Sequence, residues 1–205
     1  MGTEAKSWPW PGSGRLAGIE RKAVISVPNV FSFARLLSVP LAVWLMIEDR
    51  MAFAFWLFIA AGVTDAIDGY IAKRFDARTE LGAFLDPLAD KALLVGAYLS
   101  LGWLGHLPVW LVILVVFRDV IIVGGAFVVY AITQSFKAEP IAISKLNTAV
   151  QIALVALVLA RLGVGFDDLG ASRVLVFVAG ATTVLSGGAY MIQWTRRLNR
   201  LEGAS

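Results

Sequence analysis

Four aspartates set in two otherwise apolar stretches are the residues of this chain best suited to chemistry. They are Asp65, Asp68, Asp86 and Asp90. A carboxylate close to hydrocarbon is costly and is usually retained for a function. Residues three or four apart share one face of a helix, so each pair lines one side of its own helix. Two helices laid together through these faces would present all four carboxylates to one another.

Clustered carboxylates need compensation for their charge. Four anions in a medium of low dielectric repel strongly, so either several are protonated or cations hold them together. Ligation by oxygen alone favours Mg²⁺, Mn²⁺ or Ca²⁺ over zinc or copper. The chain has no cysteine, which excludes disulfides and zinc–thiolate sites. The simplest interpretation of the aspartates is a pair of divalent cations.

The composition predicts an all-α integral membrane protein. Of the 205 residues, 59% are hydrophobic, and the mean hydropathy is +0.76, which is too apolar for a soluble globule. Several apolar runs approach about twenty residues, the length at which a helix crosses a bilayer. Six transmembrane helices are predicted, over residues 30–47, 52–72, 81–101, 109–132, 143–162 and 174–194.

Lysine and arginine set the orientation of such helices. They gather before the first helix, after the second, around the start of the fifth and after the sixth, whereas the intervening loops are poor in cations. This alternation predicts that both termini and the aspartates face the cytoplasm, in a membrane such as the bacterial inner membrane. Residues 18–28 fit a short interfacial helix and, equally, an ordinary basic flank.

No linker divides the chain. We therefore expect one transmembrane domain over residues 29–197, preceded by an N-terminal segment over 1–28 that holds the interfacial helix, if one forms. A C-terminal tail over 198–205 follows the domain.

The aspartates belong to a longer pattern. It reads Asp65-x2-Asp68-Gly69-x2-Ala72-Lys73-x8-Gly82-x3-Asp86-x3-Asp90. This resembles the signature of the CDP-alcohol phosphatidyltransferases, D-x2-D-G-x2-A-R-x8-G-x3-D-x3-D. Lys73 stands where the family usually has arginine, and Arg74 follows it. A positive charge is kept, but the bidentate fork of arginine is kept only if Arg74 supplies it.

The resemblance implies a six-helix membrane enzyme, often homodimeric, in which an alcohol displaces CMP from CDP-diacylglycerol. It implies two divalent cations, Mg²⁺ or Mn²⁺, held by Asp65, Asp68 and Asp86 with a contribution from Asp90. Asp90 is also the best candidate for the general base on the acceptor hydroxyl. The residues expected to bind CDP are Asp65, Gly69, Ala72, Lys73, Arg74 and Gly82. The expected partners are membrane lipids and a second copy of the chain, with no nucleic acid.

Two further segments resemble one branch of the family, which makes phosphatidylglycerophosphate or cardiolipin. They read Arg118-Asp119-Val120 and Ile143-Ser144-Lys145-Leu146-Asn147-Thr148-Ala149-Val150-Gln151. Within this branch, the sequence of these segments resembles cardiolipin synthases of the eukaryotic and alphaproteobacterial type more closely. An acceptor of this branch carries a phosphate, which a site with several cations would bind.

Three cations are candidates for binding that phosphate: Arg118, Lys145 and Arg35. Arg118 lies deep in an apolar helix and needs an anionic partner. Asp119 follows it at about 100° around the helix and is not an obvious partner. The structural alternatives are an ion pair between Arg118 and an aspartate of another helix, and a snorkelling flank residue at Lys145.

Two classes of function follow. The first is a cardiolipin synthase that uses phosphatidylglycerol, with a phosphatidylglycerophosphate synthase that uses glycerol 3-phosphate as its alternative. The second is a divalent-cation or proton transporter with the aspartates as its pathway. A transporter predicts carboxylates spread through the depth of the membrane. Here all four gather near one end of their helices, which favours the enzyme.

Overall fold

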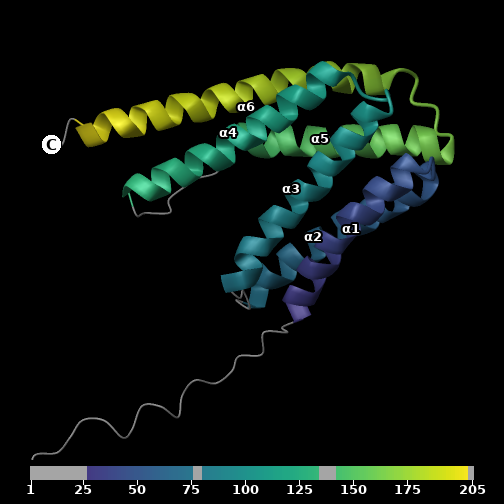
Figure 1. The fold of residues 1–205 in the computed structure, drawn as a ribbon, viewed down its shortest axis with the longest axis horizontal. Helices are drawn as coiled ribbons and strands as arrows, with labels where there is room; N and C mark the ends of the chain where they lie inside the picture. The colour runs from purple at the N-terminus through teal and green to yellow at the C-terminus, as the bar shows by residue number, and fades with distance from the viewer. Residues whose placement is uncertain (1–26, 76–79, 134–141, 203–205) are drawn as a thin grey trace, which may run out of the picture.

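The computed structural model describes residues 27–75, 80–133 and 142–202, and within them the side chains of 34–65, 67, 91–125, 142–193 and 195. All regular structure in this part of the chain is α-helical (Figure 1). The helices are α1 (Val27–Ile47), α2 (Met51–Phe75), α3 (Glu80–Trp103), α4 (Val109–Thr133), α5 (Ala142–Val164) and α6 (Ala171–Glu202). The predicted all-α class is confirmed.

Each predicted helix has its counterpart, and the boundaries agree to within three residues except at the end of α6, which continues to Glu202 instead of ending at Trp194. The residues from Thr195 to Glu202 include neither glycine nor proline, so nothing in them ends the helix. Apart from its last two residues, which begin α1, the predicted interfacial helix over 18–28 lies outside the described residues.

Two helical segments within the described residues are long and apolar enough to cross a membrane, namely Ala142–Val164 and Ala171–Gln193. Ala34–Ile47 and Met51–Asp65 are shorter apolar stretches of α1 and α2. Two spanning segments are consistent with a membrane protein. The number of six transmembrane helices stays a prediction.

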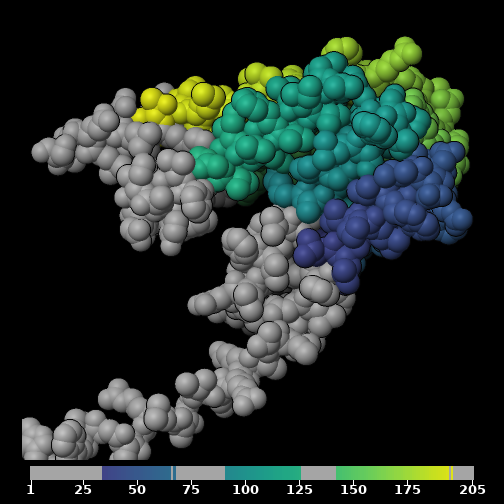
Figure 2. Space-filling view, in the orientation of Figure 1, coloured from purple at the N-terminus to yellow at the C-terminus, as the bar shows by residue number. Residues whose placement is uncertain are grey.

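The helices form two groups that separate toward one end of the molecule (Figure 1). At the other end the two groups meet, where the coloured atoms of both halves of the chain pack together (Figure 2). In one group α1 packs against α2 and α3, and in the other α6 packs against α4 and α5. Contacts of α5 with α2 and α3, and of α3 with α4, join the two groups. α5, together with the contact between α3 and α4, therefore connects the N-terminal half of the chain to the C-terminal half.

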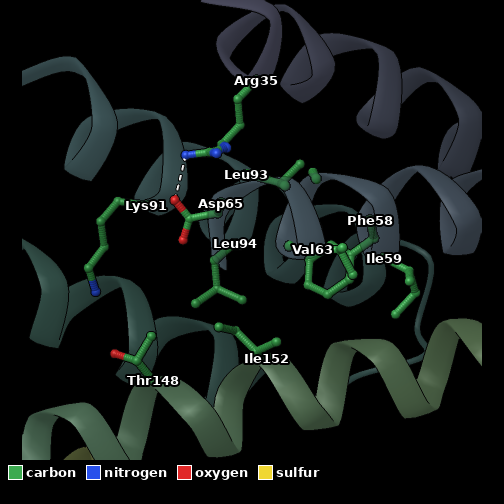
Figure 3. A pocket seen from close by; sticks show the side chains of 12 residues that line it. Arg35, Phe58, Ile59, Val63, Asp65, Lys91, Leu93, Leu94, Thr148 and Ile152 are labelled. Atoms are coloured by element: carbon green, nitrogen blue, oxygen red, sulfur yellow. Dashed lines mark hydrogen bonds and ion pairs between the residues drawn. The ribbon is translucent and has the colours of Figure 1, made fainter. Parts of the chain in front are cut away.

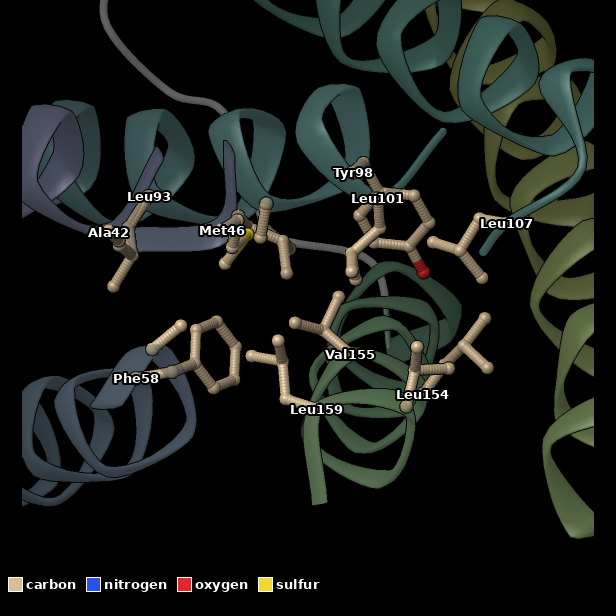
Figure 4. Close-up of a cluster of buried hydrophobic side chains, with 14 of the residues drawn as sticks. Ala42, Met46, Phe58, Leu93, Tyr98, Leu101, Leu107, Leu154, Val155 and Leu159 are labelled. Carbon is tan, nitrogen blue, oxygen red and sulfur yellow. The ribbon is translucent and has the colours of Figure 1, made fainter. Parts of the chain in front are cut away.

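The hydrophobic core lies where α1, α2, α3 and α5 meet (Figure 4), and it continues to the buried face of α4. Met46, Phe58 and Tyr98 enter it from the first three helices, and Leu154 and Leu159 enter it from α5. The start of α2 and the end of α5 also come very close. A Cβ added to Gly163 would lie 2.5 Å from the backbone nitrogen of Ala52, so only glycine fits there without a backbone shift.

The start of α6 is capped by an aspartate. Asp168 Oδ2 accepts a hydrogen bond from the backbone N–H of Ser172 at 3.0 Å, which satisfies one of the free N–H groups at the helix N-terminus. The pKa of Asp168 lies below its usual range, first because the Ser172 side chain hydrogen bonds to the carboxylate and then because of this backbone bond. The loop aspartate thus fixes where α6 begins.

Candidate active site

A pocket of about 590 Å³ lies between α1, α2, α3 and α5. Its polar lining residues are Arg35, Asp65, Lys91 and Thr148. The others are apolar: Phe58, Ile59, Ala61, Gly62, Val63, Leu93, Leu94 and Ile152. In Figure 3, Lys91 and Thr148 lie on one side of the view while Phe58 and Ile59 lie on the other. The pocket is therefore amphipathic, with its charged groups toward one end.

The charged end contains an ion pair between two residues that the sequence singles out. Arg35 Nη1 donates to Asp65 Oδ1 at 2.7 Å, which joins α1 to α2 (Figure 3). The side chain of Arg35 is 4% exposed and that of Asp65 is 44% exposed. A buried guanidinium requires an anion, so Asp65 stabilises Arg35. The half-exposed Asp65 carboxylate still faces the pocket and offers the oxygen donors that a hard cation takes.

The other three aspartates of the pattern can be located by their backbone. Asp68 lies within the last three turns of α2, and Asp86 and Asp90 lie within the first three turns of α3. The short segment 76–79 connects these two helix ends, so the topology puts all four aspartates toward the same end of α2 and α3.

The side chains of these three aspartates lie outside the described residues. The same holds for the remaining residues predicted to bind CDP: Gly69, Ala72, Lys73, Arg74 and Gly82. The described side chains contain no group of three potential metal ligands, and Asp65 is the only predicted ligand among them. Within the part of the chain whose side chains are described, Asp65 fits the predicted metal site by its chemistry and its exposure.

Arg118 has the partner that the sequence argument set aside. Its Nη1 donates to Asp119 Oδ1 at 2.6 Å, although the two residues are adjacent on α4. Lys91 of α3 donates from Nζ to both oxygens of Asp119, at 2.9 Å each. Asp119, which was not an obvious partner by its angle on the helix, is a partner of Arg118. An arginine side chain is long enough to turn back toward its neighbour, while Lys91 holds that neighbour from the facing helix.

A polar seam joins α4, α5 and α6 next to this cluster. It consists of Arg118, Ser144, Asn147, Gln151, Thr182, Thr183 and Ser186. Arg118 Nη2 donates to Ser144 Oγ at 2.6 Å and to Ser186 Oγ at 2.7 Å. The Asn147 Oδ1 atom accepts hydrogen bonds from the hydroxyls of Thr182 at 2.8 Å and Thr183 at 2.9 Å.

The seam accounts for much of the segment from Ser144 to Gln151 that resembles one branch of the family. Ser144, Asn147 and Gln151 direct their polar groups to α4 and α6, whereas Lys145 between them is exposed. Arg118 and Lys145 are thus in different surroundings, and neither is among the described residues that line the pocket. Of the three cations proposed for the acceptor, Arg35 lies at the pocket.

Sequence reasoning missed Lys91 as a pocket residue. The available signal was a lysine within an apolar helix, one position after Asp90, and such a charge requires a partner or a function. The partner, Asp119, is 28 residues away in the sequence, so no local pattern identifies it.

Comparisons with known proteins agree with the aspartate pattern. A model of the family described as CDP-alcohol phosphatidyltransferase matches residues 25–185. The chain belongs to this family. Its match covers α1 to α5 and the first half of α6, so the pocket and all members of the polar seam except Ser186 lie within the family region.

Among similar proteins, a Schizosaccharomyces pombe fusion protein of cardiolipin synthase (CMP-forming) and a mitochondrial hydrolase is 36% identical over 188 residues, covering 84% of this chain and 31% of that protein. The human cardiolipin synthase (CMP-forming) is 34% identical over 181 residues, covering 80% of this chain and 60% of that protein. A chloroplastic CDP-diacylglycerol–glycerol-3-phosphate 3-phosphatidyltransferase from Oryza sativa is 30% identical over 192 residues, covering 85% of this chain and 58% of that protein. The chain therefore spans less than two thirds of the length of these relatives.

The polar seam predicts a large effect at Asn147. In Asn147→Ala the Thr182 and Thr183 hydroxyls lose their shared acceptor, and Thr182 keeps bonds to backbone carbonyls of α6. We expect the free energy of unfolding in detergent to fall by about 1–3 kcal/mol. The measurement is thermal or denaturant unfolding followed by circular dichroism. Leu146→Ala is the control, since Leu146 is the exposed neighbour on the same helix; a loss no larger than that of the control would contradict the role of the seam.

Proposed function

We propose that this chain is a membrane phosphatidyltransferase of phospholipid biosynthesis and, within that class, a cardiolipin synthase. It transfers the phosphatidyl group of CDP-diacylglycerol to phosphatidylglycerol and releases CMP. The observation that carries the proposal is the amphipathic pocket, because Asp65 of the family pattern lies at its charged end and an apolar wall continues from there. A phospholipid has the same division, with a charged headgroup attached to hydrocarbon.

The reaction is a displacement at phosphorus. The acceptor hydroxyl forms a bond to the phosphorus of the phosphatidyl group, and the bond from that phosphorus to the oxygen of CMP breaks. Asp90 takes the proton of the hydroxyl. Such a reaction depends on positioning and on neutralising charge more than on a covalent intermediate. The residues of this chain therefore act chiefly by holding two phosphate-bearing groups in line.

Asp65, Asp68, Asp86 and Asp90 would hold two divalent cations, Mg²⁺ or Mn²⁺. When bound, these cations would neutralise the diphosphate and the departing CMP. We assign the CDP moiety to the small and basic residues of the same pattern: Gly69, Ala72, Lys73, Arg74 and Gly82. Small residues let a ligand approach the helix backbone closely.

Arg35 orients Asp65 through their ion pair, and it is a cation at the charged end of the pocket. Lys145 is exposed and available to a phosphate. Arg118 is 3% exposed and already bonded to Asp119, Ser144 and Ser186. As an acceptor ligand it would have to exchange one of these partners, so within the proposed trio we give the direct contact in the pocket to Arg35. Lys145 does not line the pocket, and we propose that it meets the acceptor phosphate outside it.

The choice of acceptor rests on the relatives. The Schizosaccharomyces pombe and human proteins named cardiolipin synthase are more similar to this chain than the rice protein named for glycerol 3-phosphate. The apolar wall serves the donor in either case, so glycerol 3-phosphate is the alternative acceptor. We further propose six membrane-spanning helices in the bacterial inner membrane, both termini and the active site at the cytoplasmic face, and a homodimer.

The proposal predicts the product of the purified protein. With CDP-diacylglycerol, Mn²⁺ or Mg²⁺, and phosphatidylglycerol, we expect CMP and cardiolipin in equal amounts, and neither product after chelation of the metal. The measurement is mass spectrometry of the lipids together with chromatography of CMP. If glycerol 3-phosphate gave product and phosphatidylglycerol did not, the alternative acceptor would be established. No CMP with any acceptor would refute the enzyme, and ion flux in liposomes free of CDP-diacylglycerol would instead support a transporter.

The role proposed for Asp90 predicts a loss of catalytic rate when this residue is replaced. Asp90→Asn removes the proposed base and a proposed metal ligand while preserving size, so we expect kcat to fall by at least about 100-fold. Asp167→Asn is the matched control, because Asp167 is an exposed aspartate of the α5–α6 loop. The measurement is the rate of CMP release, with the unfolding temperature recorded for both variants. Turnover of a folded Asp90→Asn variant at the rate of the control would refute the assignment.

A further inference from the structure

A chain of three charges crosses from α3 to α4 outside the four-aspartate pattern. Arg118 and Lys91 both donate to Asp119, Arg118 from its own helix and Lys91 from α3. The side chains of Arg118 and Asp119 are 3% and 8% exposed, whereas that of Lys91 is 36% exposed. The two cations share one anion, so the cluster carries one excess positive charge, and Lys91 is its exposed end.

Lys91 is also a residue of the pocket. It lines the same cavity as Arg35, Asp65 and Thr148, and in Figure 3 its side chain lies on the charged side of the view. Two of the three N–H bonds of an ammonium group account for the two contacts with Asp119. A third donor therefore remains on a lysine that the pocket exposes.

We propose that Lys91 contacts a phosphate of a lipid headgroup in this pocket, and that Asp119 is the positioning residue that holds the ammonium group there. The inference rests on the proposed function, since it identifies a further substrate contact of the same site. A lysine suits this role because it binds phosphate as a compact point charge. The phosphate belongs either to the diphosphate of the donor or to the phosphodiester of the acceptor.

The competing explanation is that the Lys91–Asp119 pair only ties α3 to α4. The structure offers a substitution that separates the two roles. In Lys91→Met, Asp119 keeps Arg118 as its partner, so no buried carboxylate is left unpaired. An unpaired buried charge is the usual cause of a large loss of stability when one member of a buried pair is removed. A phosphate contact should be lost in this variant while the fold remains.

The experiment compares the wild-type protein with Lys91→Met, Lys91→Arg and Asp119→Asn, using CDP-diacylglycerol and phosphatidylglycerol. We expect Lys91→Met to lower kcat/KM by roughly tenfold to a hundredfold, the range of one lost charged hydrogen bond. Lys91→Arg should recover most of this activity. Asp119→Asn should raise the same KM as Lys91→Met, and it should also lower the unfolding temperature because Arg118 loses its anion. Arg50→Met, at an exposed cation of the α1–α2 turn, should leave activity unchanged.

The KM values show which phosphate is contacted. A higher KM for CDP-diacylglycerol assigns Lys91 to the donor, and a higher KM for phosphatidylglycerol assigns it to the acceptor. Binding of each lipid, read from the rise in unfolding temperature, tests the same contact without turnover. If the wild-type protein released no CMP, the proposed function would fail, and weaker lipid binding by Lys91→Met would still support the contact.

Two results would overturn the inference. One is a Lys91→Met variant with wild-type kcat/KM and wild-type binding of both lipids. The other is a Lys91→Met variant whose activity and unfolding temperature fall together and whose activity loss is not recovered in Lys91→Arg. That result is expected if the Lys91–Asp119 pair only holds α3 and α4 together.

Discussion

A charge within an apolar helix must be paired, and the polar part of this structure follows from that constraint. Asp65 pairs with Arg35 between α1 and α2, and Asp119 pairs with both Lys91 and Arg118 between α3 and α4. These carboxylates hold buried or half-buried cations and thereby fix how the helices face one another. The Nη2 group of Arg118 extends the same principle to α5 and α6 through two serine hydroxyls.

The structure therefore has two polar regions with different roles. The seam between α4, α5 and α6 is buried apart from Ser144, which is half-buried, so its hydrogen bonds serve to hold helices together. The pocket between α1, α2, α3 and α5 is partly open and combines charged groups with an apolar wall. Lys91 belongs to the pocket and, through Asp119, is connected to the seam. A substitution in either region can therefore alter the other, which is why activity and unfolding have to be measured together.

The helices could be predicted from the sequence because each apolar run ends in charged residues, glycine or proline, and most predicted ends agree closely with the structure. The family followed from the aspartate pattern, whose spacing is local. The pairing of Arg118 could not be predicted in this way. The angle between two residues on a helix does not show how far a long side chain such as that of Arg118 can reach. The second partner of Asp119, Lys91, comes from another helix, which no local pattern reveals. Likewise, the pattern around Asn147 indicates the family branch, but only the packing of α6 reveals that its polar groups bond to threonines.

We infer that the amphipathic pocket is the site of a lipid phosphoryl transfer. An experimental structure of the protein with CDP-diacylglycerol and Mn²⁺ would show whether the lipid binds there. We expect manganese beside Asp65, the diphosphate at the charged end of the pocket, and an acyl chain along Phe58 and Ile152. A nucleotide and metal bound away from α2 and α3, with this pocket filled by neither headgroup nor acyl chain, would contradict this inference.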